Sequence, residues 1–463
     1  MDSEETTLVV RLRSEVADDL TAAAGYELKL DDRRELARQL IVERLQLVAS
    51  QALASGAGPL DPEQERRIAR AVLDALFGLG RLQALIDDPE IENIDVNGCD
   101  RVWVTFSDGS KAQVERIADS DLELTEMIRS AAARFGLSER RFDASHPELD
   151  LRLPDGSRLS ALMSVVRRPV ASIRRHRYVD LTIDDLVAMG GLDRSLAGML
   201  TAAVRARKNI VVGGAMNSGK TTLVRALASA IPPRERVVTI EQAFELGLDS
   251  LPHRHPDLVA LEARPSNSEG EGAISMARLV RRALRMNADR VVVGEVLGDE
   301  VLPMLNAMSQ GRSGSMCTIH ADSALGIFRR LASYAVQAPE RLPLESTNLL
   351  IAGAVHFAVF VESIDRPEPS ESLRYLNSWG TDELSDTRTT AAARFEAVTR
   401  RRFVSSVHEV VGAEGLQVVS NEVFRTDRDG KAVPAAPLQM STLDDLTAVG
   451  FDPSTMRAET LSW

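Results

Sequence analysis

The feature that most constrains the fold is one stretch from Gly214 to Thr221, which reads Gly-Ala-Met-Asn-Ser-Gly-Lys-Thr. It fits the pattern G-x4-G-K-[ST] in full. It follows the apolar run Ile210 to Val212 and precedes a segment predicted to be helical, which is the context that a phosphate-binding P-loop requires. The alternative, a glycine-rich turn that binds no nucleotide, is the weaker interpretation because both the pattern and its context are complete.

The residue types in this stretch suit a nucleoside triphosphate. Its glycines let backbone N–H groups wrap phosphate oxygens, and the N-terminus of the following helix adds the positive end of its dipole. Lys220 is expected to reach the β- and γ-phosphates, and the Thr221 hydroxyl to ligate Mg²⁺. Lysine is rare here, since only five of the 55 basic residues are lysines, so Lys220 is unlikely to stand there by accident. The predicted nucleotide-binding residues of this segment are Gly214, Asn217, Ser218, Gly219, Lys220, Thr221 and Thr222.

From about Leu181, apolar strands alternate with helices. Near-continuous apolar strands in such an alternation are typical of a parallel sheet covered on both faces, so we expect an α/β domain. The predicted strands are Asn209–Val212, Arg236–Ile240, Arg290–Val293 and Ser315–Ile319.

Two of these strands run into carboxylates. Glu241 follows Ile240 directly, and Glu295 follows Val293 after one glycine. Ligands of parallel sheets bind at the carboxyl ends of the strands, so both acids can lie beside the phosphates. An exposed loop acid is the alternative interpretation of each, and their joint occurrence with a P-loop favours the functional one.

Glycine, proline and helix-capping residues mark the predicted boundaries between the segments of the rest of the chain. Before the α/β region we expect a smaller α+β domain, with a helix from Asp61-Pro62, a helix over Ser120–Phe135 and a hairpin of Leu149–Leu153 with Arg158–Met163. The leader is expected to hold a short strand at Leu8–Leu12 and a helix from about Arg33. The predicted parts are a helical leader (1–60), the α+β domain (61–178), a linker (179–190), the α/β domain (191–365), a polar acidic surface loop (366–395) and a β-rich C-terminal extension (396–463).

Composition excludes several classes of protein. A net charge of −13 argues against a main surface that binds nucleic acid. Cys99 and Cys317 are too few for a disulfide framework, and the acidic N-terminus differs from a secretory signal. The longest apolar run, 349–361, is too short to span a bilayer. We therefore expect a cytoplasmic protein without a transmembrane segment, and we interpret His253-Arg254-His255 as a loop rather than a metal site.

Three further segments resemble motifs of one ATPase superfamily. Ile240–Leu246 is similar to the Asp box of the type II/type IV secretion ATPases, Val293–Val296 to their atypical Walker B motif, and Gly311–Ala321 to their His box. The family that the chain resembles is that of the CpaF/TadA-type ATPases of pilus assembly and secretion. Other matching stretches are Asp88–Ile91, Val96–Gly98, Leu153–Arg158, Leu279–Met286 and Ser406–Gly412, so the resemblance spans about Asp61 to Phe424.

This resemblance implies a RecA-like ATPase domain behind the N-terminal domain, with ATP between the two. It implies that Glu241 polarises the attacking water, that Glu295 lies near Mg²⁺, and that His320 senses the γ-phosphate. Arg158 and Arg174 match arginines of the N-terminal domain that approach the phosphates. It also implies a hexameric ring on the inner face of the cytoplasmic membrane, which powers pilus assembly or secretion through an inner-membrane platform protein.

The charge pattern of the sequence independently supports a role in phosphate binding for Arg158 and Arg174. Between Arg140 and Arg177 the chain has nine arginines and four acidic residues, a local charge of +5 in a chain of −13. Such a patch suits a triphosphate, and an arginine supplied across a closing cleft contributes about 10³–10⁵ in rate in other P-loop enzymes. A solvated basic face is the alternative for any single arginine of this set.

Three positions depart from the family pattern. Gln242 stands where an aspartate is usual, Arg312 where the first histidine of the His box belongs, and Leu297 where an arginine usually follows Gly-Glu-Val. They leave open a nucleotide-binding regulator or scaffold with low turnover. A DNA-translocating conjugation ATPase is a third alternative, which the acidity of the chain disfavours.

Overall fold

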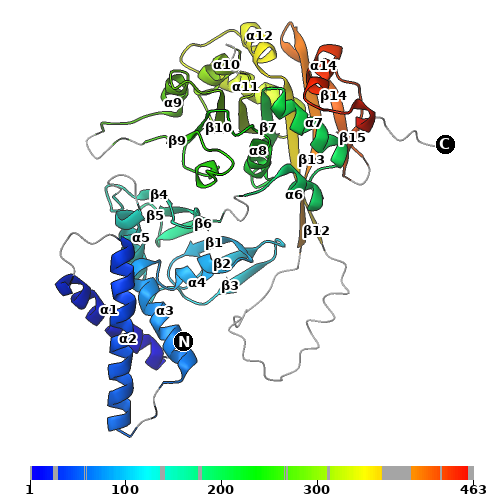
Figure 1. Ribbon diagram of the computed structural model, residues 1–463. Coiled ribbons are helices and arrows are strands. Elements are labelled where there is room, and N and C mark those ends of the chain that lie inside the picture. The colour runs from blue at the N-terminus through cyan, green and yellow to red at the C-terminus, as the bar shows by residue number, and fades with distance from the viewer. Residues whose placement is uncertain are drawn as a thin grey trace. The chain divides into compact units, whose positions relative to one another are not determined.

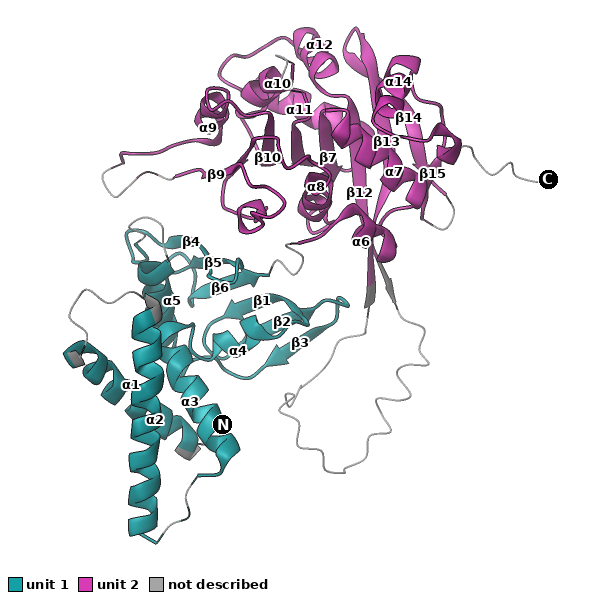
Figure 2. Ribbon diagram, viewed as in Figure 1, with its two compact units in different colours: residues 1–175, 380–395 teal, residues 176–379, 396–463 magenta. Residues whose placement is uncertain are grey.

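The computed structural model describes residues 3–23, 30–56, 58, 60–135, 141–175, 180–264, 266, 270–309, 313–367, 398–427 and 430–456. These residues form two compact units that divide after Arg175 (Figure 2). The predicted acidic loop lies almost wholly, from residue 368, outside the described residues, and so does Arg312. No described helix is long and apolar enough to cross a bilayer.

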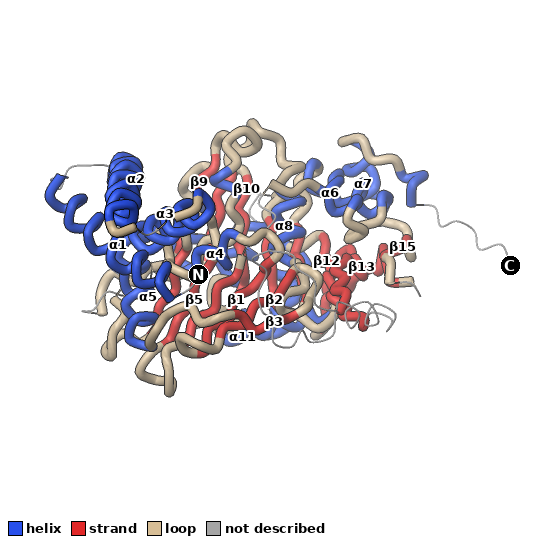
Figure 3. The backbone as a smooth tube through the Cα atoms, turned by 90° about the horizontal axis from the view of Figure 1, so that it is seen from below, coloured by secondary structure: helices blue, strands red, loops and turns tan. Residues whose placement is uncertain are grey.

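The N-terminal unit begins with three helices, α1 (Ser3–Ala23), α2 (Leu30–Ala54) and α3 (Pro62–Phe77), which lie side by side (Figure 3). Asp61 caps α3, and its side chain accepts from the backbone N–H groups of Glu63 and Gln64. The strand predicted at Leu8–Leu12 is wrong, because this segment lies within α1. Leu12, Val16 and Leu20 recur at helical spacing and are all buried against the other two helices, and this packing overrides the local strand preference.

The rest of this unit is a six-stranded antiparallel sheet of order β3-β2-β1-β6-β5-β4. Its strands are β1 (Ile91–Asn97), β2 (Val102–Phe106), β3 (Lys111–Val114), β4 (Glu148–Arg152), β5 (Arg158–Leu162) and β6 (Val170–Arg174). Alternate residues such as Leu151, Leu159 and Ile173 are buried with residues of α4 (Leu82–Asp87) and α5 (Asp121–Phe135). The predicted helix over 120–135 and the predicted hairpin are confirmed.

The second unit is built on a nine-stranded sheet of order β15-β14-β13-β12-β7-β11-β10-β8-β9 (Figure 1). The six strands from β12 to β9 are parallel, whereas β13, β14 and β15 add antiparallel strands beside β12. The sheet is therefore mixed, which differs from the parallel sheet that we expected from the sequence. The four predicted strands are confirmed as β7, β8, β10 and β11. The strands are β7 (Ile210–Gly214), β8 (Val237–Glu241), β9 (Leu258–Glu262), β10 (Arg290–Val296), β11 (Met316–His320), β12 (Phe357–Pro367), β13 (Val398–Glu414), β14 (Gln417–Thr426) and β15 (Ala432–Pro434).

Helices cover both faces of this sheet, as the apolar strands predicted. Ile210 and Val212 of β7 belong to one buried cluster, with residues of α7, α8 and α14, while Val211 between them belongs to a second, with residues of α9 to α12. The helices and short 3-10 turns are α6 (Ile183–Ala188), α7 (Arg194–Arg205), α8 (Lys220–Ala228), η1 (Leu248–Ser250), α9 (Met276–Ala283), α10 (Val301–Ser309), α11 (Ala324–Gln337), α12 (Leu344–Ala354), α14 (Met440–Ala448) and η2 (Pro453–Met456). The chain is therefore α/β, with a smaller antiparallel α+β unit before it.

Candidate active site

The four residues predicted to carry the chemistry lie at one edge of the large sheet. Strands β7, β11, β10 and β8 are consecutive and parallel, so their carboxyl ends meet there. Lys220 opens the helix that follows β7, His320 ends β11, Glu295 is the penultimate residue of β10 and Glu241 ends β8. Sheet order thus brings together residues that are up to 100 positions apart in the chain.

The loop after β7 has the backbone of a phosphate-binding loop. Asn217 and Gly219 adopt left-handed conformations, with φ of 59° and 99°, and Gly219 immediately precedes α8. A Cβ on Gly214 would lie 2.5 Å from Ser218 Oγ and from the carbonyl oxygen of Val361, so no side chain fits there. The glycines of the motif are therefore required by geometry.

Ser218 tests whether this loop suits a phosphate. Its side chain is fully buried, yet its Oγ has no hydrogen-bond partner among the described residues. A buried hydroxyl without a partner costs about 1–3 kcal/mol, a cost that a phosphate oxygen bound at this position would relieve. The loop thus fits the ligand that its sequence predicts.

Lys220 contacts its own loop and the neighbouring strand β11 in this structure. Its Nζ lies 3.2 Å and 2.9 Å from the carbonyl oxygens of Gly214 and Ala215, and 3.1 Å from Nδ1 of His320. Nε2 of His320 lies 2.6 Å from Oε1 of Glu295. Since the ammonium of Lys220 can only donate, its contact with Nδ1 is compatible with a neutral imidazole whose proton is on Nε2, the nitrogen that faces Glu295.

The surroundings of His320 favour this neutral form. Burial lowers the pKa of His320 below its ordinary value, and the positive charge of Lys220 lowers it further. The charge of Glu295 and a hydrogen bond with the Gly214 backbone oppose these effects without cancelling them. A neutral imidazole here can exchange one partner for another without leaving an unpaired buried charge. The continuous series Lys220–His320–Glu295 therefore links the P-loop to the acid of β10.

Glu241 is held in a different environment. Its side chain is buried, and Oε1 accepts from the backbone N–H groups of Glu245 and Leu246 at 2.9 Å and 2.7 Å. Burial outweighs these hydrogen bonds and raises the pKa of Glu241 to about 7. A carboxyl group with a pKa near 7 is suited to accept a proton from water at neutral pH.

The acid on β10 is more accessible. The side chain of Glu295 is 35% exposed, and the adjacent Gly294 leaves room for Glu241, since a Cβ there would lie 2.9 Å from Glu241 Cγ. The Gly294 carbonyl accepts from Thr318 Oγ1 at 2.6 Å. Glu295 and Thr221 are the residues that could hold Mg²⁺, because a half-exposed carboxylate and a hydroxyl are ligands that this ion prefers.

Arg158 and Arg174 belong to the N-terminal unit, where the sheet register places them directly opposite each other on β5 and β6. Arg152 on β4 lies opposite Arg158, so three arginines form a row across three strands. Like charges directly opposite in a sheet destabilise it, and here Asp150 offsets part of this repulsion, since its carboxylate lies 3.5 Å from the guanidinium of Arg158. Sequence reasoning missed Arg152 as a member of this row. The approach of the row to a nucleotide in the second unit stays a prediction.

Two arginines of the site could not be found from the sequence. Arg225 on α8 is buried and donates from Nε to the carbonyl oxygen of Leu246 at 2.9 Å and from Nη2 to that of Glu245, and so it braces the turn that holds Glu241. Arg402 on β13 donates from Nε to the carbonyl oxygen of Asn217 at 2.9 Å. Neither lies in a recognisable motif, and Arg402 is 185 positions from its partner.

Two of the three departures from the family pattern lie at exposed positions. Gln242 is exposed, and Leu297 is 47% exposed, with its backbone N–H donated to the carboxylate of Glu300. Neither belongs to the series from Lys220 to Glu295. The third, Arg312, lies outside the described residues.

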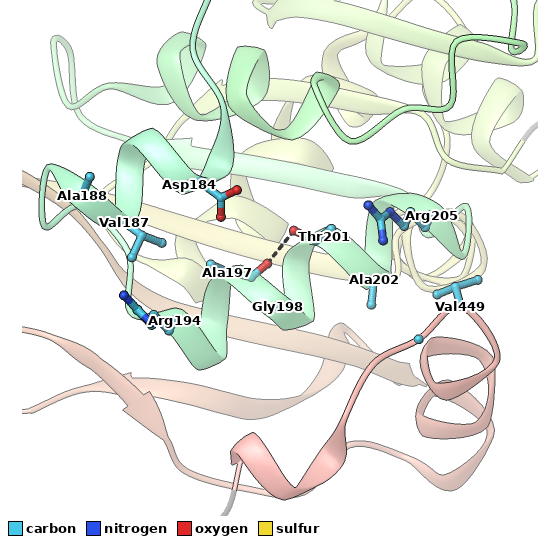
Figure 4. Close-up of a pocket in the computed structure, with 11 residues that line it drawn as sticks. Asp184, Val187, Ala188, Arg194, Ala197, Gly198, Thr201, Ala202, Arg205 and Val449 are labelled. Carbon is cyan, nitrogen blue, oxygen red and sulfur yellow. Dashed lines mark hydrogen bonds between the residues drawn. The ribbon is translucent and has the colours of Figure 1, made fainter.

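A hollow of about 790 Å³ lies elsewhere on the second unit (Figure 4). Small residues of α7, among them Ala197, Gly198 and Thr201, form its floor, and Arg194 and Arg205 lie towards the two ends of that helix. None of the predicted site residues lines it. The hollow is therefore separate from the P-loop edge.

Comparisons with known proteins agree on one family. The model of the family described as "Type II/IV secretion system protein" matches residues 77–428. Type IV secretion system protein PtlH of Bordetella pertussis is 31% identical over 334 residues, 66% of this chain and 95% of PtlH. A Mycobacterium tuberculosis protein named "Putative conjugal transfer protein Rv3659c" is 35% identical over 263 residues, 55% of this chain and 72% of its own.

A solved structure of a relative is also similar. The VirB11 ATPase of the Brucella suis type IV secretion system shares 27% sequence identity, over 64% of this chain and 92% of that one, with a TM-score of 0.32.

Proposed function

The chain belongs to the type II/IV secretion system protein family and is an ATPase of it, and from this premise we propose that ATP hydrolysis at the P-loop edge drives pilus assembly or protein secretion. The observation that carries the proposal is the convergence of Lys220, His320, Glu295 and Glu241 on one sheet edge. CpaF/TadA-type motors are the subfamily that we propose, on the motifs quoted from the sequence.

Each residue has a proposed part in hydrolysis. Lys220 exchanges the carbonyls of Gly214 and Ala215 for the β- and γ-phosphates, and its departure frees Nδ1 of His320. Glu241 orients the attacking water and accepts its proton. Thr221 and Glu295 hold Mg²⁺, which when bound neutralises charge that develops on the phosphates.

We propose further that the protein acts as a homo-oligomer, of which a hexameric ring is the form implied by the family resemblance. Arg158 and Arg174 of the N-terminal unit then approach the phosphates and stabilise charge on them. In this proposal the ring lies on the cytoplasmic face of the inner membrane and passes its movement to a platform protein of the secretion or pilus system.

The test compares ATP hydrolysis and nucleotide binding in the wild type, Lys220→Ala and Glu241→Gln. We expect Lys220→Ala to lose nucleotide affinity, and Glu241→Gln to retain affinity while hydrolysis falls by about 10²–10⁴. Hydrolysis at background level in the wild type, alone or with lipid, together with tight ATP binding would support the low-turnover regulator instead. Absence of any nucleotide binding would overturn both.

A second candidate function is transfer of DNA in conjugation, because one relative carries the name of a conjugal transfer protein. A net charge of −13 opposes contact with DNA over the main surface. Retention on DNA that falls steeply with salt would support this candidate. ATP hydrolysis that is unaffected by DNA at low salt would exclude direct translocation.

A further inference from the structure

An arginine of the C-terminal strands reaches the phosphate-binding loop. Nε of Arg402 donates to the carbonyl oxygen of Asn217 at 2.9 Å. The same side chain passes close to Gly219, where an added Cβ would lie 3.6 Å from Cδ of Arg402. Arg402 therefore lies against the two residues of the loop that adopt left-handed conformations.

The hydrogen bond constrains one peptide group. In a trans peptide the carbonyl and the following N–H point in opposite directions, so fixing the oxygen of Asn217 also fixes the direction of the Ser218 N–H. In this structure that N–H donates to the carbonyl oxygen of Ala215 within the loop, over a long distance of 3.4 Å. Left-handed φ at a residue other than glycine costs about 1 kcal/mol or more and needs support from its surroundings. Arg402 provides that support from outside the loop.

The position of Arg402 is itself fixed by the sheet. It lies opposite Ser363 of β12, and Val404 of the same strand donates its backbone N–H to the carbonyl oxygen of Gly191 at 3.0 Å. Its neighbour Arg401 has its guanidinium 5.3 Å from the centre of the Phe403 ring. Successive side chains of a strand point to opposite faces, so only one of the two arginines can reach the loop.

We propose that Arg402 is a positioning residue for the phosphate-binding loop: it holds the Asn217–Ser218 peptide so that the Ser218 N–H exchanges its long contact with the Ala215 carbonyl for bound phosphate. The proposal rests on the nucleotide site proposed above and adds a contribution from the C-terminal strands. Because the loop binds the phosphates that ATP and ADP share, Arg402 acts equally on both nucleotides. It contributes to nucleotide affinity and not to the hydrolytic step.

The experiment compares the full chain with its Arg402→Ala, Arg402→Lys and Arg401→Ala variants. Kd for ADP and for a non-hydrolysable ATP analogue, KM and kcat for ATP, and Tm without nucleotide are measured for each. We expect Arg402→Ala to raise both Kd values and KM about tenfold, while kcat changes less than about twofold and Tm falls by no more than about 2–4 °C, the shift that loss of about 1 kcal/mol produces. Arg402→Lys should recover part of the affinity, and Arg401→Ala should match the wild type.

Several results would overturn the proposal. Unchanged Kd values in Arg402→Ala would show that this residue does not position the phosphate-binding loop. A loss confined to the ATP analogue would mean that Arg402 senses the γ-phosphate, and an equal loss in Arg401→Ala would mean a general charge effect. If Arg402→Ala does not fold, Arg402→Lys decides, with equal loss of ADP and ATP affinity expected. A wild type that binds no nucleotide would instead defeat the proposed function.

Discussion

At the scale of single residues, two carboxylates lie at the same sheet edge in different surroundings. Glu241 is 2% exposed and accepts two backbone N–H groups, whereas the side chain of Glu295 is 35% exposed and contacts His320. The first environment suits a group that takes up a proton, and the second a group that solvent and a bound cation can reach. The two glutamates thus differ in their proposed roles in hydrolysis because their environments differ, and not because of their residue type.

Glu241 predicts a pH-dependent stability. Its pKa is about 7 in the fold against an ordinary 4.5, so the folded state holds this proton more tightly than the unfolded state. The raised pKa therefore contributes about 3 kcal/mol to the free energy of unfolding. This contribution is complete below about pH 4.5 and is lost as pH rises through about 7. Glu241→Gln keeps an acceptor but has no proton to lose. We expect its free energy of unfolding, relative to the wild type, to increase between pH 5 and 8 in denaturant titrations. A difference that does not vary with pH would contradict this.

At the scale of elements, the site depends on how closely β10 approaches the end of β8. Arg290 to Val293 of β10 pair in parallel with Val237 to Ile240 of β8, and the next residue of each strand is Gly294 and Glu241. Gly294 has no Cβ where one would meet Cγ and Oε1 of Glu241 at 2.9 Å and 3.2 Å. Because Gly294 has no side chain, Glu241 can occupy the space beside it.

Substituting that glycine should disturb hydrolysis more than binding. Gly294→Ala forces Glu241 to move, so we expect kcat to fall about tenfold or more while Kd for ADP changes little. Gly298→Ala is the matched control, because its Cβ would be 3.8 Å from the nearest atom, a side-chain oxygen of Glu300. Steady-state kinetics and equilibrium binding measure both. Equal kcat values for the two variants would show that the close approach does not position Glu241.

At the scale of the whole molecule, the residues proposed for catalysis are divided between two units. The P-loop edge lies in the second unit, and the row of Arg152, Arg158 and Arg174 crosses the sheet of the first. Three like charges in register weaken the sheet that carries them. Asp150, 3.5 Å from Arg158, offsets part of this repulsion, and we propose that a bound anion offsets the rest.

Activity and stability should therefore respond differently to the loss of one arginine. Arg174→Gln relieves repulsion from Arg158, and we expect the free energy of unfolding to stay constant or rise by about 0.2–1 kcal/mol. ATP hydrolysis should fall by up to about 10³–10⁵-fold if Arg174 approaches the phosphates as such an arginine does. Arg167→Gln, an exposed arginine in the loop between β5 and β6, is the control and should leave hydrolysis unchanged. Unaltered hydrolysis in Arg174→Gln would assign the row to another anion.

The contributions of sequence and tertiary structure can be separated at particular residues. The P-loop, the hairpin of β4 and β5 and the four central strands could be predicted, because each depends on a few consecutive residues whose spacing fixes backbone geometry. Glu241 and Glu295 could be placed at one edge, because parallel strands end together. The strand expected at Leu8–Leu12 was wrong, because burial against α2 and α3 decides that segment.

Other features were decided only by the tertiary structure. The contact of Lys220 with His320 requires β11 to lie beside β7, and that of Arg402 with Asn217 requires β13 to pair with β12. Strand order and hydrogen bonds between distant segments depend on which surfaces pack together, and no local spacing encodes them. The sequence by itself therefore predicted the kind of ligand and the residues that we propose to face it. The packing of the sheet determined the distances between those residues and the burial that raises the pKa of Glu241.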